Sequence, residues 1–279
     1  MKKNILIVGG TGFIGFHISK LLKKKNKVFS ISKNKPKKNR WLNGVKYIFC
    51  DIFYKKELYK KLEKENFDYV INLGGYVDHS NKLKTLQSHY YGCKNLVDYF
   101  KKKNIKLFIQ IGSSLEYGKL KSPHDEKQKC KPTAIYGKSK YKSSQYILNS
   151  DKMYSFSYVI LRLYQVYGPN QSINRLIPIV ISSCIKNKKF NCSSGIQKRD
   201  FLYIDDLVNL INKLILTKKK IKGIFNVGSG NPKSVRDTIE IIQKKVKRGI
   251  PQFGKIKMRK DESLNYYPKL NKIKKSINW

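Results

Sequence analysis

Residues 9–15 read Gly9-Gly10-Thr11-Gly12-Phe13-Ile14-Gly15, and this glycine-rich turn decides how the rest of the chain is interpreted. A short apolar run at 4–8 precedes the turn, and apolar residues at helical spacing follow it. Glycines at 9, 12 and 15 allow a tight turn and let the backbone approach a pyrophosphate at the positive end of the helix. A glycine turn between a strand and a helix therefore predicts a dinucleotide-binding site.

The order strand, helix, strand recurs along the chain beyond the turn. Apolar runs bounded by turn residues predict buried strands at 4–8, 28–32, 45–50, 69–73, 107–112, 157–163 and 223–227. Helical periodicity predicts helices that begin at Phe13 and that cover 55–65, 83–102, 135–149 and 176–186, with more helix within 201–217. This alternation predicts an α/β fold, a Rossmann-type doubly wound parallel sheet covered by helices.

The rhythm of elements changes after Tyr167-Gly-Pro169. We expect residues 1–168 to form a NAD(P)-binding Rossmann domain to which residues 201–228 return. Residues 169–200 and 229–279 are expected to form a small, partly interleaved C-terminal substrate-binding region. The last fifty residues are rich in lysine and show weaker periodicity.

The bulk composition is that of a globular protein with an extreme charge. Of 279 residues, 40% are hydrophobic, and 60 basic residues against 18 acidic ones give a net charge of +42. Such a field attracts phosphates and nucleic acid. The lysines are spread over nearly all presumed helix ends and loops, and no aromatic platform is interleaved with a basic stripe, so we expect a solvated surface rather than a nucleic-acid partner.

Neither a metal site nor a membrane segment is expected. The five cysteines are scattered without a C-x-x-C pair, and His17, His79, His89 and His124 form no spacing that would clamp a metal. No apolar run approaches the ~18 to 20 residues of a membrane span. The first residues pass straight into the glycine turn without a signal-peptide cleavage region, so we expect a cytoplasmic protein.

A second motif, Tyr136-Gly-Lys-Ser-Lys140, places a tyrosine one helical turn before a lysine. The spacing alone is uninformative in a lysine-rich chain, because it recurs at Tyr90/Lys94, Tyr99/Lys103 and Tyr117/Lys121. On one helix face, the positive charge of Lys140 is expected to lower the pKa of Tyr136 from its usual ~10. Tyr136 could then exchange a proton near neutral pH.

The chain resembles the extended short-chain dehydrogenase/reductase family of nucleotide-sugar epimerases, dehydratases and reductases over nearly its whole length. The resemblance rests on the glycine turn and on landmarks that follow it in order: Asp51-Ile52, Val70-Ile-Asn-Leu-Gly-Gly75, Gly112-Ser-Ser-Leu-Glu-Tyr-Gly118, Tyr136-x-x-x-Lys140, Leu161-Arg-Leu-Tyr-Gln-Val-Tyr-Gly-Pro169, Arg199-Asp-Phe-Leu-Tyr-Ile-Asp-Asp206 and Phe225-Asn-Val-Gly-Ser-Gly230.

The resemblance implies a catalytic set of Ser113, Tyr136 and Lys140. In a reduction, Tyr136 protonates a sugar ketone that receives hydride, Ser113 hydrogen-bonds its oxygen, and Lys140 also holds the nicotinamide ribose. Together with Tyr136 and Lys140, the implied cofactor-binding residues are Gly9, Thr11, Gly12, Phe13, Ile14, Gly15, Ser32, Lys33, Asp51, Ile52, Leu73, Gly74 and Gly75.

The end of the second strand indicates which dinucleotide is bound. An acid there hydrogen-bonds the adenosine ribose of NAD and repels the 2′-phosphate of NADP. Here the strand ends Ser30-Ile-Ser32-Lys33, with no acid until Asp51. The sequence therefore favours NADP, with NAD as the alternative.

The implied substrate is a nucleotide-diphosphate sugar. Its expected contacts are Ser113, Ser114, Gln165, Arg175, Leu176, Arg199 and Arg259, with arginines suited to phosphate oxygens. The resemblance also implies a homodimer and a place in cell-surface polysaccharide biosynthesis. His89 and Gln165 stand where asparagine is usual in the family, and Gly74-Gly75 replaces the commoner Ala-Ala.

Three functions remain open. Family dehydratases carry an Asp-Glu pair where this chain has Ser114-Leu115, so dehydration is not expected. We favour an NADP-dependent reductase of a nucleotide-linked 4-keto (6-deoxy) sugar, and the alternative is a NAD-dependent nucleotide-sugar 4-epimerase. A non-catalytic, nucleic-acid-binding member of the fold is a third possibility, kept open by the charge of +42.

Overall fold

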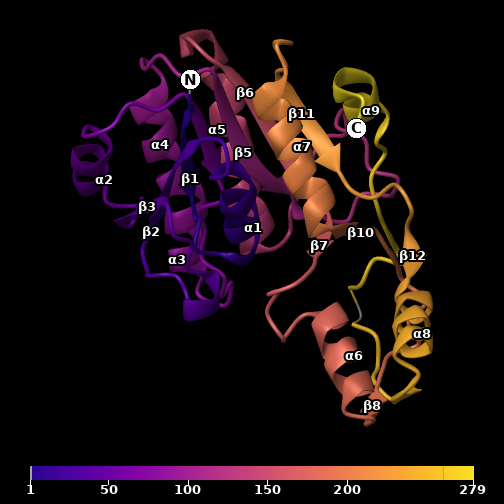
Figure 1. Ribbon diagram of the computed structural model, residues 1–279. Coiled ribbons are helices and arrows are strands. Elements are labelled where there is room, and N and C mark those ends of the chain that lie inside the picture. Colours follow the sequence, from indigo (N-terminus) through magenta and orange to yellow (C-terminus); the bar gives the residue numbers. More distant parts are fainter. Residues whose placement is uncertain (1, 260) are drawn as a thin grey trace.

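A seven-stranded parallel sheet forms the centre of the computed structural model, which describes residues 2–259 and 261–279 (Figure 1). Met1 and Lys260, which the predicted domains include, lie outside the described residues. The strand order is β11-β6-β5-β4-β1-β2-β3. The strands are β1 (Asn4–Val8), β2 (Lys27–Ser32), β3 (Val45–Phe49), β4 (Tyr69–Asn72), β5 (Leu107–Ser113), β6 (Ser157–Leu163) and β11 (Gly223–Val227).

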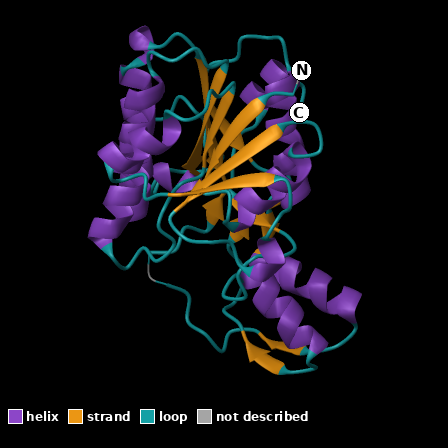
Figure 2. Ribbon diagram, turned by 60° about the vertical axis from the view of Figure 1, so that its left-hand side comes forward, coloured by secondary structure: helices purple, strands orange, loops and turns teal. Residues whose placement is uncertain are grey.

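Helices cover both faces of the sheet (Figure 2). One core lies between the sheet and α1 (Phe13–Leu22), α7 (Ile204–Leu216) and α9 (Asn271–Ile277). The other lies between the sheet and α2 (Lys55–Leu62), α4 (Gly92–Phe100) and α5 (Ile135–Asn149). Neighbouring strand residues enter opposite cores, Leu6 one and Ile7 the other, which is why the strands are apolar throughout. The predicted fold class is confirmed.

The strand order reverses at β1, which is where open parallel sheets bind ligands. Val8, the last residue of β1, pairs with Asn72 of β4 on one side and with Ile31 of β2 on the other. The glycine turn after Val8 therefore lies between the carboxyl ends of β4 and β2. Ser113 ends β5 at the same edge of the sheet.

The helix expected at 83–102 is interrupted by a π-helical turn. It consists of α3 (Lys82–Leu86), the π turn η2 (Gln87–Tyr91) and α4. The neighbouring helix α5 supports the turn, because Ser143 Oγ donates a hydrogen bond of 2.7 Å to the backbone oxygen of His89. π turns inside α-helices are frequent at functional sites.

A smaller lobe hangs below the sheet in Figure 1 and has its own apolar core. Its two helices are α6 (Leu176–Ile185) and α8 (Val235–Val246), which pack together. Its strands form two small sheets: β8 (Lys189–Asn191) with β13 (Ile250–Gln252), and β9 (Lys198–Arg199) with β12 (Lys233–Ser234) and β14 (Asn265–Tyr266). The parallel pair β7 (Gln165–Tyr167) and β10 (Phe201–Tyr203) leads into and out of the lobe.

The C-terminal region departs from the sequence expectation in two ways. Its weak periodicity gave no prediction of α8, although a capping box of Ser234 and Asp237 begins that helix. The expected substrate-binding region also does not hold all of 229–279. Ile273 and Ile277 of α9 pack into the main core, so the end of the chain returns to the Rossmann domain. The domain division otherwise stays a prediction.

A buried ion pair links β5, β6 and α5. Arg162 Nε lies 3.0 Å from Glu116 Oε2, and the two side chains are 2% and 0% exposed. Ser144 of α5 donates to the same oxygen at 2.9 Å, and the backbone N–H of Ser113 donates to Oε1 at 2.9 Å. The carboxylate therefore fixes the end of β5, where the 3₁₀ turn η3 (Ser114–Glu116) begins.

Glu116→Gln is expected to destabilise the protein strongly. The substitution leaves the guanidinium of Arg162 buried without a counter-charge, which costs about 3–5 kcal/mol in free energy of unfolding. Urea denaturation measures the loss. The control is Glu65→Gln, which breaks the surface pair of Glu65 with Lys46 and is expected to cost about 0–1 kcal/mol. An equal loss in the two variants would contradict the assigned role of the buried pair.

Candidate active site

The three predicted catalytic residues lie together at the carboxyl edge of the sheet. Ser113 ends β5, and Tyr136 is the second residue of α5, which packs against β5. Lys140 follows one helical turn later on the same face and donates a hydrogen bond of 2.8 Å from Nζ to the backbone oxygen of Ile111. Two elements that meet at one sheet edge thus bring the three side chains together.

Burial dominates the electrostatics of Lys140, which is 3% exposed. Desolvation lowers the pKa of its ammonium group from 10.5 to about 8, and Cys93 and Glu116 oppose this shift only in part. Lys140 therefore carries its charge at neutral pH and loses it within the mildly alkaline range.

The pKa of Tyr136 moves in the direction opposite to the sequence expectation. Burial raises the pKa of the phenol, while a hydrogen bond with Ser113 and the charge of Arg175 act against the rise. Lys140 Nζ lies 6.0 Å from the ring centroid, and its charge does not overcome the desolvation. Tyr136 is therefore a protonated acid at neutral pH, so the prediction of a lowered pKa was wrong in direction.

Two histidines that the sequence reasoning left without a role pack against Tyr136. The imidazole of His79 stacks on its ring with centroids 4.0 Å apart and planes at 15°. His89, in the π turn, meets the same ring edge-on at 5.0 Å and 79°. His79 belongs to the loop that follows β4 and the glycine pair. Because loops after parallel strands lie at the catalytic edge of the sheet, its place in the sequence could have marked His79 as a site residue.

His89 and Gly75 are fitted to each other. A Cβ on Gly75 would lie 1.9 Å from His89 Cε1, so the imidazole fills the space that an alanine side chain would need. Burial first, and Lys140 second, lower the pKa of His89 to about 2. The ring is therefore neutral, and its Nε2 lies 3.2 Å from the backbone oxygen of Tyr76.

The glycine turn has the geometry that a dinucleotide phosphate requires. Gly9 adopts a φ of +79°, and a Cβ on Gly15 would lie 2.4 Å from the backbone oxygen of Gly9, so α1 packs directly onto the turn. The helix begins at Phe13 without a side-chain cap from Gly12. Its first N–H groups are therefore free to bind phosphate oxygens, and the turn fits the predicted cofactor.

The neighbouring cofactor candidates differ in how far they are buried. The backbone N–H of Thr11 lies 3.5 Å from Ser32 Oγ, and Lys33 Nζ lies 3.2 Å from Asp51 Oδ2. Ile52 is 6% exposed and packs in the core. The other predicted residues line the turn or the end of β4, with half-buried side chains or hydrogen-bonded backbone, and they are Phe13, Ile14, Leu73 and Gly74.

The predicted substrate residues near the catalytic set are Ser114, Gln165 and Arg175. Ser114 is buried beside Ser113, and Gln165 is exposed at the start of β7. Arg175 stands at the N-cap position of α6. Burial lowers the pKa of His79 and the charge of Arg175 adds to this, whereas the same charge opposes the burial that raises the pKa of Tyr136. Ser114 thus comes from the sheet edge and Arg175 from the start of helix α6 in the smaller lobe.

Three other predicted contacts are placed differently. Arg199 Nη2 lies 2.6 Å from Glu262 Oε1, and its Nη1 donates to the backbone oxygen of Ser263, so a diphosphate would have to replace Glu262. Leu176 packs against the core of the smaller lobe. Arg259 is exposed in the segment before Glu262.

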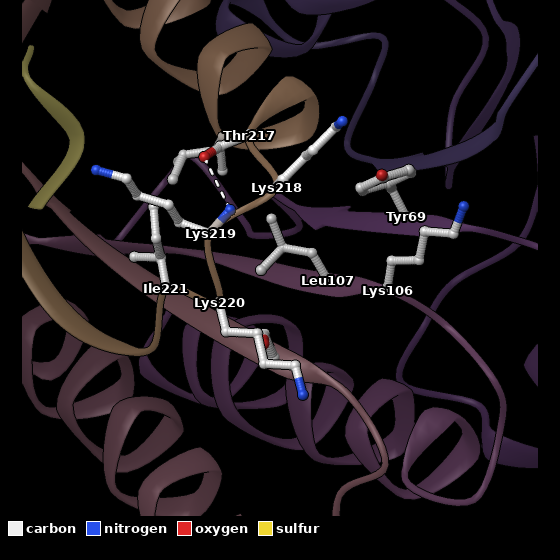
Figure 3. A pocket seen from close by; sticks show the side chains of 10 residues that line it. Tyr69, Lys106, Leu107, Thr217, Lys218, Lys219, Lys220 and Ile221 are labelled. Atoms are coloured by element: carbon white, nitrogen blue, oxygen red, sulfur yellow. Dashed lines mark hydrogen bonds between the residues drawn. The ribbon is translucent and has the colours of Figure 1, made fainter.

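A lysine-lined recess of about 330 Å³ lies at the opposite edge of the sheet, far from the catalytic residues. It is formed where β4 and β5 begin and α7 ends. Figure 3 shows Lys218, Lys219 and Lys220 pointing in different directions from consecutive positions. Because these side chains do not converge, the recess presents solvated charges rather than an anion site.

Within residues 2–259 and 261–279, no three histidine, cysteine, aspartate or glutamate side chains gather in a metal-binding group. Among the helices of the same residues, none has the length and apolar character needed to cross a membrane.

Comparison with protein families decides the classification. The model described as "NAD dependent epimerase/dehydratase family" matches residues 5–228, which include the glycine turn, the catalytic set and β11. The chain belongs to this family. The resemblance inferred from the motifs is confirmed, and with it the prediction that the chain belongs to a class of enzymes.

Curated relatives of this chain are named for several different activities. A dTDP-D-glucose 4,6-dehydratase of Dictyostelium discoideum is 30% identical over 256 residues, which cover 81% of this chain and 58% of that protein. A putative UDP-glucose 4-epimerase of Methanocaldococcus jannaschii is 29% identical and covers 99% and 97%. A CDP-abequose synthase of Salmonella typhimurium is 26% identical and covers 100% and 93%.

Solved structures of epimerases share the fold. A UDP-glucose 4-epimerase of Thermotoga maritima superposes with a TM-score of 0.90 at 22% identity, covering 99% of this chain and 93% of that one. A UDP-N-acetylglucosamine 4-epimerase of Methanobrevibacter ruminantium gives 0.89 at 25% identity, covering 100% and 93%. These matches confirm the fold, and they leave the reaction of this member open.

Lys140→Met is expected to stabilise the apoprotein at pH 7. Below pH 8 the folded state bears the full cost of burying the ammonium, up to about 3 kcal/mol for a pKa lowered from 10.5 to about 8. Between pH 8 and 10.5 the unfolded chain binds this proton and the folded chain does not, so wild-type stability rises with pH. The stability difference from the variant should therefore shrink across this window.

Urea denaturation at pH 7 and at pH 10 measures the effect of Lys140→Met. The control is Lys138→Met, which removes an exposed lysine of the same helix. If the free energies of unfolding of wild type and Lys140→Met differ by the same amount at the two pH values, the pKa of Lys140 is not lowered by burial.

The stack of His79 on Tyr136 predicts an upfield shift of the imidazole ring protons of His79 in NMR spectra. With four histidines in the chain, the His79 signals can be assigned by their loss in His79→Gln. Tyr136→Phe keeps a ring and should keep the shift, whereas Tyr136→Leu should abolish it. His17, which packs against Phe13 and Phe16 instead, is the internal reference. Unchanged His79 signals in Tyr136→Leu would exclude the stack.

Proposed function

We propose that the protein reduces a nucleotide-linked 4-keto (6-deoxy) sugar with NADP as cofactor. The observation that supports the proposal is that a glycine turn fitted to a dinucleotide and a protonated acid, Tyr136, lie at the same edge of the sheet. The raised pKa of Tyr136 keeps the phenol protonated, as a proton donor requires. The chemistry is thereby limited to one hydride and one proton.

Each catalytic side chain has a distinct task in this reaction. A reduced nicotinamide, when bound, supplies the hydride. Tyr136 donates its proton to the carbonyl oxygen, and Ser113 hydrogen-bonds the same oxygen. The phenolate that forms is stabilised by the hydrogen bond with Ser113 and by the charge of Arg175. Lys140 holds the ribose of the cofactor. Its ammonium group stays charged at neutral pH, one helical turn after Tyr136.

Dehydration fits this site less well. It requires a further acid and base where the chain has Ser114 and Leu115. The carboxylate of Glu116, which follows these two residues, is fully buried and bound to Arg162 and Ser144. It therefore offers no second proton-transfer group, although several relatives are named 4,6-dehydratases.

The second candidate is a 4-epimerase that oxidises and re-reduces one sugar with a retained NAD. The putative UDP-glucose 4-epimerase that matches almost the full length of the chain favours it. The same three catalytic residues would serve. CDP-abequose synthase, a relative of similar coverage, is named for a different activity at this degree of similarity.

The proposal extends to the setting of the reaction. We place the substrate, a nucleotide-diphosphate sugar, between the catalytic edge and the smaller lobe, with Arg175 on the side of the lobe. We also propose a cytoplasmic homodimer that takes part in cell-surface polysaccharide biosynthesis. A nucleic-acid-binding role rests on the charge of +42 alone, and the divergent lysines of Figure 3 do not support it.

Tyr136→Phe is expected to lower kcat/KM for reduction by about 10²–10⁴-fold, because it removes the proton donor and keeps the ring. The measurement is NADPH oxidation with 4-keto nucleotide sugars, together with NADPH binding, which should be unchanged. Tyr141→Phe, on the same helix, is the matched control. Interconversion of two sugars without net NADPH oxidation would identify the epimerase, and full activity of Tyr136→Phe would exclude Tyr136 as the proton donor.

A further inference from the structure

The end of the smaller lobe that lies farthest from the large sheet, marked by β8 in Figure 1, exposes both apolar and basic side chains. We call residues 181–191 and 244–257 the tip. They include the last turns of α6 and α8 and the paired strands β8 and β13. The two segments are joined by a hydrogen bond of 3.0 Å from the N–H of Ile250 to the backbone oxygen of Lys188.

Four isoleucines of the tip are exposed, although the lobe has an apolar core of its own. They are Ile181 (38%), Ile185 (60%), Ile250 (53%) and Ile256 (51%). Ile181 and Ile185 lie one turn apart on the same face of α6. Ile185 and Ile250 directly follow Cys184 and Gly249, which pack together, since a Cβ on Gly249 would lie 2.7 Å from Cα of Cys184. The tip therefore presents aliphatic surface from both of its segments.

The charged side chains of the tip all have the same sign. The tip holds nine lysine and arginine residues and no aspartate or glutamate, and all nine basic residues are exposed. On α4, by contrast, Lys94 and Lys101 both pair with Asp98. No carboxylate within the tip offsets its positive potential, which lies beside exposed aliphatic side chains.

This combination of side chains distinguishes between possible occupants. A second copy of the tip would bring the same positive charge to the contact and would be repelled. Nucleic acid would leave the isoleucines unused, because bases stack on aromatic rings rather than on aliphatic chains. An anionic bilayer matches both features, since lysines bind lipid headgroups and aliphatic side chains enter the boundary with the acyl chains.

We propose that the tip docks on the surface of a bilayer that contains anionic lipids. The four exposed isoleucines lie at the boundary between headgroups and acyl chains. The lysines around them contact the headgroups, while their methylene groups cover apolar surface. Docking through this end separates the catalytic edge from the bilayer by the length of the lobe (Figure 1). The contact involves neither cofactor nor sugar, so its test is independent of the proposed reaction.

Sedimentation with lipid vesicles tests the contact. Wild type is expected to bind vesicles that contain about one-third phosphatidylglycerol in phosphatidylcholine, to bind phosphatidylcholine alone much more weakly, and to dissociate at high salt. The double variant Ile185→Asn, Ile250→Asn should bind the anionic vesicles about tenfold or more weakly, because it removes apolar surface that the bilayer buries. Lys188→Gln should weaken binding about fivefold, the contribution of one lysine near an anionic surface.

A matched control lies at the opposite edge of the sheet. Leu216, the last residue of α7, is 64% exposed, and Lys219 is exposed in the segment that follows. The double variant Leu216→Asn, Lys219→Gln removes one apolar and one basic side chain there and should leave vesicle binding unchanged. Circular dichroism of each variant checks that the fold persists.

A tryptophan placed in the tip reports where the chain meets the bilayer. With anionic vesicles, the emission of Ile185→Trp is expected to shift to the blue, and that of Leu216→Trp is not. The two natural tryptophans, Trp41 and Trp279, give the background spectrum of wild type.

Four results would overturn the proposal. Wild type could fail to bind anionic vesicles, the double isoleucine variant could bind as wild type does, or the control variant could lose as much binding as that variant. A blue shift of Ile185→Trp with soluble polyglutamate, and none with vesicles, would make the tip a surface for an acidic protein instead.

Discussion

The buried pair of Glu116 and Arg162 is the interaction on which the catalytic edge depends. Two charges are removed from water at the junction of β5, β6 and α5, and hydrogen bonds from Ser144 and the backbone N–H of Ser113 to the carboxylate help to offset their desolvation. The same contacts set the end of β5 relative to α5. The carboxylate that gives Ser113 its position is for that reason not available to act on a substrate.

Local patterns were sufficient for the sheet and for most of its helices. The bounds of β6, α5 and β11 coincide with the predicted segments. The two strands were predictable because a strand buried on both faces is a continuous apolar run whatever lies around it. The π turn at 87–91 was not predictable in this way, since it is supported by Ser143 of another helix. Lysine enrichment also masked the short periodicity of α8 and α9.

The structure brings the three predicted catalytic residues together, whereas the electrostatics expected from the sequence differ from those of the folded chain. Counting charges along a helix predicted a lowered pKa for Tyr136, but burial outweighs the nearby lysine and itself lowers the pKa of Lys140 to about 8. His79 and His89 are ten residues apart, a spacing without meaning until the loop after β4 and the π turn bring both rings to Tyr136.

The fit of His89 to Gly75 makes the two positions historically dependent on each other. With histidine in place, any residue larger than glycine at position 75 would overlap the imidazole. Starting from an asparagine and an alanine, the glycine therefore has to arise first, and the histidine can be accepted only afterwards. Once both are present, a reversal must replace the histidine before the glycine, so the order of the two substitutions is constrained in both directions.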